Sequence, residues 1–129
     1  MKKVISLTLL IAIVFAIPAA VYASSYYITF DFTANLTGQT RSFSGSNINI
    51  QTNAIQSSCT LYPASSTFQV SLYRNRTWPI PNDYIGSAYH YRDGYSSTTW
   101  TNVGSGNYFS IFSKATDTCR ITGDGYIQN

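Results

Sequence analysis

The residues best suited to bind a ligand lie at positions 73–78, which read Tyr-Arg-Asn-Arg-Thr-Trp. Arg74 and Arg76 stand two positions apart, so a continuing strand would project both guanidinium groups and Trp78 to one side. Arginine binds carboxylates and phosphates through paired hydrogen bonds, and aromatic faces bind sugar rings or bases. One face of the next strand would add a second set, Tyr84, His90 and Arg92. The predicted ligand-binding residues are therefore Tyr73, Arg74, Arg76, Trp78, Tyr84, His90 and Arg92.

The same residues also have a purely structural interpretation. Tyrosine is favoured in strands, and arginine on an exposed strand keeps sheets from pairing edge to edge. The pattern therefore predicts either a polar-aromatic platform for an anionic glycan or teichoic-acid-like polymer, or an ordinary tyrosine-rich sheet. The residue types alone leave both alternatives open.

Catalysis is not indicated by the residue types. His90 is the only histidine, and the sequence lacks a nucleophile motif such as Gly-x-Ser-x-Gly that could complete a Ser-His-Asp triad. A glycosidase pair usually includes glutamate, and this chain has none. Asp117 and Asp124 do not follow a known calcium-loop spacing, and zinc usually needs four ligands. We predict no catalytic residue, no metal site and no cofactor.

Residues 1–23 have the three-part layout of a secretory signal peptide. A dilysine start precedes a long apolar stretch, Pro18 breaks the helix, and Val21 and Ala23 have the spacing that a signal peptidase requires. We predict that cleavage leaves residues 24–129 as a secreted, extracellular protein that meets a membrane only through this peptide during export. The alternative is an uncleaved anchor, since the apolar stretch is near the minimum length for a bilayer.

Removal of this segment also changes the charge balance. Both lysines of the leader are lost, so six Lys and Arg residues stand against five Asp residues, a net charge of +1 instead of +3. A charge so close to zero gives little long-range attraction to nucleic acid, and we predict no nucleic-acid partner. Asn35 and Asn75 begin N-glycosylation sequons, which matter only in a eukaryotic host, whereas the leader is of a bacterial type.

Cys59 and Cys119 are the only cysteines of the chain. Because secretion exposes them to an oxidising environment, we predict a disulfide bond between them. Closing a loop of about 60 residues lowers the entropy of the unfolded chain, which stabilises the fold by about 4 kcal/mol in the entropy model. Free thiols or a bridge between two molecules are the alternatives.

Alternation of apolar and polar residues with a period of two predicts an all-β fold. About eight short strands are separated by turn residues, a pattern typical of a single antiparallel β-sandwich or jelly-roll-like domain. Asp93-Gly94 and Gly104-Ser105-Gly106 predict hairpin turns, and Gly123-Asp124-Gly125 predicts a break between two final strands. The predicted strands cover residues 26–32, 40–44, 46–52, 67–74, 84–92, 97–103, 107–113, 119–122 and 126–128.

Three segments do not follow this alternation. Residues 33–39 predict a polar loop, and Pro79 and Pro81 exclude continuous strand pairing in residues 76–83. Residues 53–66 are the one place where a short helix could fit.

Two segments, TFQVSLY at residues 67–73 and WTNVGSGNYF at residues 100–109, carry a family resemblance. They resemble the strand-and-hairpin core of small bacterial exoprotein β-sandwiches of the pre-peptidase C-terminal type. The resemblance spans residues 67–113 and departs from the family at the proline loop. It implies a sandwich-shaped accessory module without catalytic residues.

Together these features predict a small secreted, non-enzymatic protein that binds an extracellular surface, either a glycan or a cell-wall polymer. One alternative is a secreted antimicrobial or toxin-like protein that acts on target membranes, although its low charge offers little attraction to anionic lipids. Another is a self-associating extracellular matrix protein. The sequence leaves the oligomeric state open.

Overall fold

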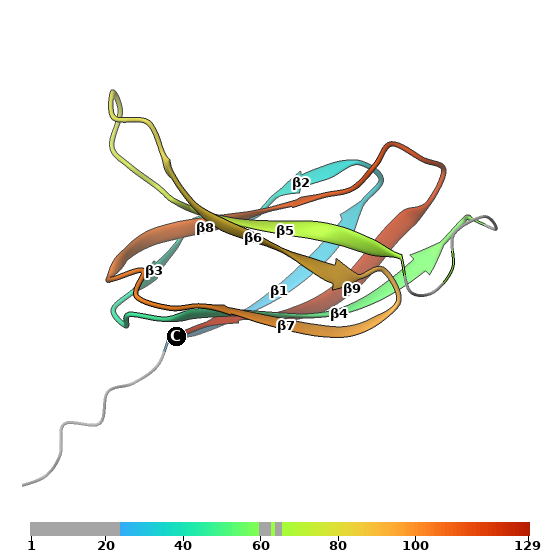
Figure 1. Ribbon diagram of the computed structural model, residues 1–129, viewed down its shortest axis with the longest axis horizontal. Coiled ribbons are helices and arrows are strands. Elements are labelled where there is room, and N and C mark those ends of the chain that lie inside the picture. Colours follow the sequence, from blue (N-terminus) through green and yellow to red (C-terminus); the bar gives the residue numbers. More distant parts are fainter. Residues whose placement is uncertain (1–23, 60–62, 64–65) are drawn as a thin grey trace, which may run out of the picture.

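Two antiparallel β-sheets packed face to face make up the computed structural model, which describes residues 24–59, 63 and 66–129 (Figure 1). The predicted signal peptide lies outside these residues. Across the described ranges the secondary structure is entirely strand, turn and loop, and no helix there is long and apolar enough to cross a membrane. The prediction of an all-β antiparallel sandwich is confirmed.

The first sheet has four strands in the order β1-β9-β4-β7, and the second has five. In the five-stranded sheet the order is β2-β8-β5-β6, and β3 pairs with β8 beside β2. The strand bounds are β1 Ser25–Phe32, β2 Asn35–Thr37, β3 Arg41–Phe43, β4 Ile48–Ser57, β5 Thr67–Arg74, β6 Asp83–Tyr91, β7 Gly94–Trp100, β8 Gly106–Ser113 and β9 Arg120–Gln128.

The core lies between the sheets and follows the predicted alternation. Phe68, Val70 and Leu72 of β5 are buried in the core, whereas Gln69 and Ser71 between them point to the outer face, where Gln69 is half-buried and Ser71 is buried by its neighbours. Ile48 and Ile50 of β4 are completely buried on the opposing sheet. Burying one such side chain stabilises the fold by about 2 kcal/mol, so the two inner faces supply most of the driving force. An aromatic cluster of Phe30, Phe32, Phe68 and Phe112 fills the centre.

The predicted disulfide bond is present and joins Cys59 to Cys119 across a sequence separation of 60 residues. Cys59 follows β4 and Cys119 precedes β9, two strands that pair along their whole length. The bond therefore links the ends of two neighbouring central strands of the four-stranded sheet.

The two predicted hairpin turns are wrong. Asp93-Gly94 connects β6 of the five-stranded sheet to β7 of the four-stranded sheet, and residues 104–106 return the chain from β7 to β8. Both connections are corners between sheets, although Gly94 does adopt the positive φ of 114° that its turn signal predicts. A local turn signal does not distinguish a hairpin from a corner, because only the pairing partners of the strands differ.

The predicted break in the last strand is also wrong, since β9 is continuous from Arg120 to Gln128. Gly123 and Gly125 lie on its inner face between β1 and β4, where the neighbouring backbones come close. A Cβ atom on Gly125 would lie 1.9 Å from the carbonyl oxygen of Gln51, and one on Gly123 would lie 2.2 Å from that of Asn53. These glycines therefore serve close strand packing instead of a turn.

The irregular segments follow the predictions in part. The proline loop is confirmed, since residues 75–82 connect β5 to β6 without strand structure. The loop predicted at residues 33–39 contains the short strand β2, and the start of the possible helix at residues 53–66 is strand β4 instead. Residues 60–62 and 64–65 of that segment lie outside the described residues.

Candidate functional site

The outer face of the five-stranded sheet arranges its side chains in rows that run across β8, β5 and β6. The strand register aligns three residues in each row, one from each strand. The aromatic row consists of Phe109, Tyr73 and Tyr84. The hydroxyl row consists of Ile111, Ser71 and Ser87. The distal row consists of Ser113, Gln69 and Tyr89.

The aromatic row forms a continuous ledge of three rings. The rings of Tyr73 and Phe109 stack with their centroids 5.4 Å apart and an interplanar angle of 11°. The ring of Tyr84 tilts against the other side of Tyr73 at a centroid distance of 5.5 Å. Tyr84 is 59% exposed, whereas its two neighbours are half-buried. Ring-to-ring packing holds the ledge in one orientation.

Three hydroxyl groups connect the aromatic row to the hydroxyl row. The Tyr84 hydroxyl lies 2.8 Å from Ser87 Oγ, which in turn lies 2.8 Å from Ser71 Oγ. Ser71 is only 7% exposed, so further hydrogen bonds to a partner would come from the half-buried Ser87 and the exposed Tyr84 hydroxyl. Beyond the serines, Tyr89 of the distal row is 71% exposed. The face thus presents aromatic rings on both sides of a short polar stretch.

An open pocket adjoins the distal row. It has a volume of about 270 Å³ and extends the outer face beyond Tyr89 and Gln69. Its lining residues are Thr67, Phe68, Gln69, Tyr89, Arg92, Ser113, Lys114 and Ala115.

Tyr84 reaches the outer face because of a bulge in β6. The register shifts there, since Leu72 pairs with Gly86 whereas Tyr73 pairs with Tyr84. The extra residue reverses the side-chain alternation, so Tyr84 faces outward and His90 faces the core. The prediction that Tyr84, His90 and Arg92 share one face is therefore wrong.

His90 lies in the core, where it connects the two sheets. It is completely buried, with Nδ1 2.7 Å from Thr52 Oγ1 and Nε2 2.9 Å from Thr98 Oγ1. Thr52 belongs to β4 and Thr98 to β7, so both partners are on the opposing sheet. Burial lowers the pKa of His90 to about 4, and the ring is neutral at physiological pH.

Arg92 is also buried, in an ion cluster at the end of the sandwich near the disulfide bond. It donates to the Thr67 carbonyl at 2.9 Å and to Asp117 at 2.9 Å, and Lys114 donates to the same carboxylate at 2.6 Å. Burial acts to raise the pKa of Asp117, but hydrogen bonds from Lys114, the Cys119 amide and Arg92 hold it below its usual range. These contacts fix the chain between β8 and β9.

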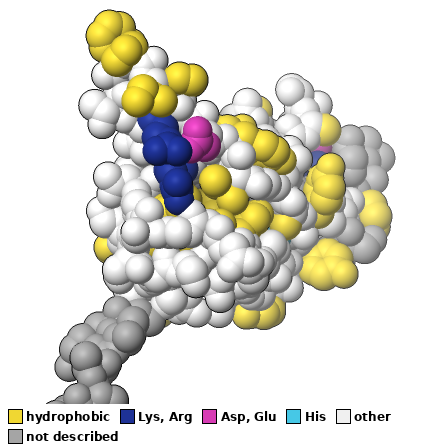
Figure 2. Space-filling model, turned by 60° about the vertical axis from the view of Figure 1, so that its left-hand side comes forward, with side chains coloured by type: hydrophobic (Ala, Val, Ile, Leu, Met, Phe, Trp, Pro, Cys, Tyr) yellow, Lys and Arg dark blue, Asp and Glu magenta, His cyan; other side chains and the backbone are white. Residues whose placement is uncertain are grey.

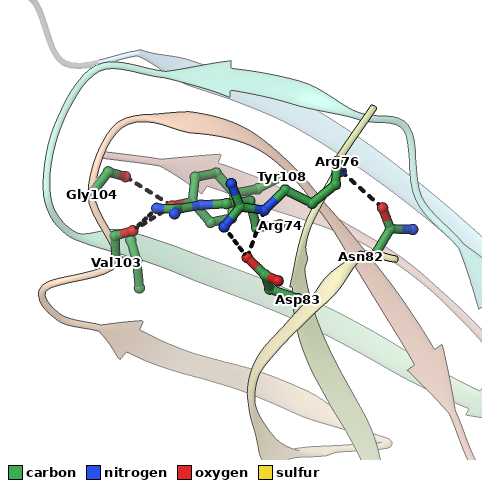
Figure 3. Close-up of polar contacts among 7 residues, drawn as sticks. All are labelled: Arg74, Arg76, Asn82, Asp83, Val103, Gly104 and Tyr108. Carbon is green, nitrogen blue, oxygen red and sulfur yellow. Dashed lines mark hydrogen bonds and ion pairs between the residues drawn. The ribbon is translucent and has the colours of Figure 1, made fainter. Parts of the chain in front are cut away.

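Arg74 and Arg76 are engaged with other residues of the protein (Figure 3), Arg74 in a half-buried position and Arg76 in an exposed one. Arg74 Nε donates to the Tyr108 hydroxyl at 3.0 Å, and its guanidinium also reaches the Val103 carbonyl. Arg76 Nε donates to Asp83 at 2.7 Å, which forms an ion pair at the base of the proline loop. One arginine therefore anchors the corner before β8, and the other braces the connection from β5 to β6.

That connection, residues 75–82, projects from the body as an arm (Figures 1 and 2). Its tip, residues 78–81, consists of Trp78, Pro79, Ile80 and Pro81, all exposed. Trp78 is 89% exposed and Ile80 60%. Figure 2 shows hydrophobic side chains at the end of this projection and the arginine and acidic side chains at its base.

The structure thus divides the seven predicted ligand-binding residues among three places. Tyr73 and Tyr84 meet on the aromatic face, Arg76 and Trp78 belong to the arm, and Arg74, His90 and Arg92 have internal roles. Sequence reasoning missed Phe109, Ser71, Ser87 and Tyr89. Ser71 lies two positions before Tyr73 on the same strand, so the period of two could have placed both on one face. Phe109 joins them only through the pairing of β5 with β8.

Among the residues that the structure describes, no group of three or more His, Cys, Asp or Glu side chains could hold a metal ion. No protein-family model matches the chain, and no curated protein resembles it at a significant level. The resemblance to pre-peptidase C-terminal modules therefore stays a prediction from the sequence.

Proposed function

We propose that this protein is a secreted, non-enzymatic module that binds a neutral glycan of an extracellular surface through the outer face of its five-stranded sheet. The observation that carries the proposal is the aromatic row beside the hydroxyl row. A sugar ring has apolar C–H faces and a polar rim, and this face offers rings and hydroxyl groups in the same alternation.

The dimensions of the face suit an extended ligand. Adjacent rows are two residues apart along β5 and β8, which corresponds to about 7 Å, so the aromatic and distal rows are about 13 Å apart on these strands. A glycan chain that follows β5 would pack on Tyr73 and Tyr84, cross the serine hydroxyls and reach Tyr89. The open pocket next to Tyr89 and Gln69 would receive the end of the chain or a branch.

The charges on this face favour a neutral polymer over the anionic one that the arginines suggested. None of the nine residues in the three rows is charged. Arg74 and Arg76 are directed to Tyr108 and Asp83, and Arg92 is buried against Asp117. Binding to this face should therefore depend little on ionic strength.

The test is retention of the exported protein on isolated cell walls and on a panel of neutral and anionic polysaccharides. We expect retention on neutral polymers, and at least about tenfold weaker binding for Tyr84→Ala combined with Tyr89→Ala, because each substitution removes an exposed ring. Tyr27→Ala combined with Tyr126→Ala is the matched control on the opposite outer face. Absence of retention on every polymer, or equal retention by both double variants, would contradict the proposal.

A further inference from the structure

We propose that the tip of the arm, residues 78–81, inserts into the interfacial region of a lipid bilayer. This interaction lies beyond the proposed glycan binding and uses different residues. The sequence predicts that the protein meets a membrane only through its signal peptide, with action on target membranes as an alternative. The inference rests on the exposure, the backbone and the charges of the arm.

The first observation is how completely the apolar tip is exposed. Trp78 and Ile80 are 89% and 60% exposed, and the prolines beside them are exposed as well. The tip is convex and stands away from the body (Figure 2), so it presents its side chains to a surface in front of it. Tryptophan and isoleucine gain free energy when they leave water, and tryptophan in particular favours the membrane interface.

The second observation concerns the backbone amides of the tip. Pro79 and Pro81 have no N–H group, and the Ile80 amide donates to the Thr77 carbonyl at 3.0 Å within the arm. Three of the four tip residues would therefore place no unpaired N–H group in the lipid. An unpaired backbone donor costs several kcal/mol in hydrocarbon, so this backbone is suited to lipid. A protein partner that docked on the same segment would find few amide donors to bind.

The third observation is the shape and charge of the arm behind the tip. Arg76 and Asp83 form an ion pair at its base, and the Arg76 amide donates to the Asn82 side chain at 2.9 Å. These contacts hold the two sides of the arm together, so insertion orders little additional chain. The paired charges also give the base no net charge to place near the lipid headgroups. Insertion should accordingly not require anionic lipid, in agreement with the net charge of +1 for residues 24–129.

The experiment measures partitioning of the exported protein onto vesicles of zwitterionic phosphatidylcholine by co-sedimentation. We expect binding that changes less than about twofold when salt is raised, since no ion pairing with lipid is involved. The variant Trp78→Ser combined with Ile80→Ser should bind at least about 30-fold more weakly, because both inserted side chains become polar. Tyr84→Ala is the matched control and should bind the vesicles like the unmodified protein.

Fluorescence supplies a second measurement that does not depend on affinity alone. The chain has two tryptophans, and Trp100→Phe leaves Trp78 as the only source of tryptophan emission, which selective excitation separates from the tyrosines. We expect the emission of Trp78 to shift to the blue on vesicles and to be quenched by lipids brominated near the headgroups. Thermal unfolding of the serine variant should match that of the unmodified protein, which shows that the tip and not the fold was changed.

Three outcomes would overturn the inference: no partitioning of the unmodified protein onto any vesicle, binding only to anionic vesicles, or full binding by the folded serine variant. Because the vesicles carry no glycan, failure here leaves the glycan proposal intact. Failure of the Tyr84 and Tyr89 substitutions on polysaccharides likewise leaves membrane insertion intact.

Discussion

The outer faces of the two sheets contain similar numbers of exposed tyrosines but differ in what surrounds them. On the four-stranded sheet the Tyr27 hydroxyl donates to Asp124, and Asp31 pairs with Arg120 through two hydrogen bonds of 2.7 and 2.5 Å. On the five-stranded sheet the tyrosine rings contact other rings and serine hydroxyls, and none of the three rows contains a charge.

Under our proposal, this difference separates a solvated surface from one that binds a ligand. Charged and amide groups of the four-stranded face satisfy one another, as when the Asn49 amide donates to both Ser97 and Thr99 at 2.9 Å. On the five-stranded face the Tyr84 and Tyr89 rings are 59% and 71% exposed, so their apolar faces are open to an external partner, although Ser71 is buried. The presence of tyrosine in a strand therefore says little about binding until its neighbours across the sheet are known.

The largest expected effect is a loss of stability caused by a substitution in the four-stranded sheet. Gly125→Ala places a Cβ atom 1.9 Å from the Gln51 carbonyl oxygen, so β9 and β4 must separate. We expect a loss of about 4 kcal/mol or more in the free energy of unfolding, measured by urea denaturation. Ser97→Ala, on the exposed face of β7, is the control and should change stability little. An unaltered midpoint for Gly125→Ala would show that the close strand packing is not required.

Acid should weaken the connection between the two sheets. The pKa of His90 falls from 6.5 to about 4 on folding, so the unfolded chain binds a proton that the folded protein excludes in this range. The free energy of unfolding therefore has its full value above about pH 6.5. It declines by about 3 kcal/mol in total as the pH falls toward 4. Urea denaturation between pH 7 and 4 measures this slope.

His90→Gln is the control for the acid effect. It should be less stable than the unmodified protein at pH 7 but lack the slope between pH 6.5 and 4. The low pKa values of Asp31 and Asp117 act separately, because their stabilisation is lost only as the pH falls below the range in which free aspartates titrate. A slope that persists without the histidine would contradict the role assigned to His90.

Removal of the two serine hydroxyls from the hydroxyl row should weaken glycan binding without disturbing the fold. Ser71→Ala combined with Ser87→Ala deletes both partners of one hydrogen bond, so neither hydroxyl is left unpaired by the loss of the other. We expect glycan affinity to fall about tenfold, with a change in unfolding free energy below about 1 kcal/mol. Calorimetric titration and urea denaturation measure the two quantities. Unchanged affinity would exclude the serines from the site.

The smallest effect is expected on the four-stranded outer face. Arg120→Ala removes the exposed ion pair with Asp31, which solvent and salt screen. Its melting temperature should stay within experimental error of the unmodified protein, and its glycan binding should be unchanged. A clear loss of either property would mean that this face contributes more than its exposure suggests.

The sequence predicted the strands well because burial imposes a period of two. Phe68, Val70 and Leu72 identify the inner face of β5 without any knowledge of its partners. The disulfide bond could be predicted because Cys59 had only one possible partner in the chain.

The site could be predicted only in part, because its geometry depends on strand pairing across long separations. Tyr84 changes face through a bulge that has no local signature, and Phe109 reaches Tyr73 only because β5 pairs with β8. The chemistry of arginine predicts a surface position for Arg74 and Arg92, but the structure places them in half-buried and buried positions, respectively. Tyr108 and Asp117, which bind Arg74 and Arg92, come next to them only in the folded chain.

Tyrosine footprinting compares the two outer faces most directly, in a single experiment on the unmodified protein. The protein is nitrated with and without a neutral wall polysaccharide, and mass spectrometry measures the modification of each tyrosine. We expect the glycan to protect Tyr84 and Tyr89, while Tyr27 and Tyr126 on the four-stranded face react as before. Equal reactivity of Tyr84 and Tyr89 with and without the glycan, or protection confined to Tyr27 and Tyr126, would contradict binding to the five-stranded face.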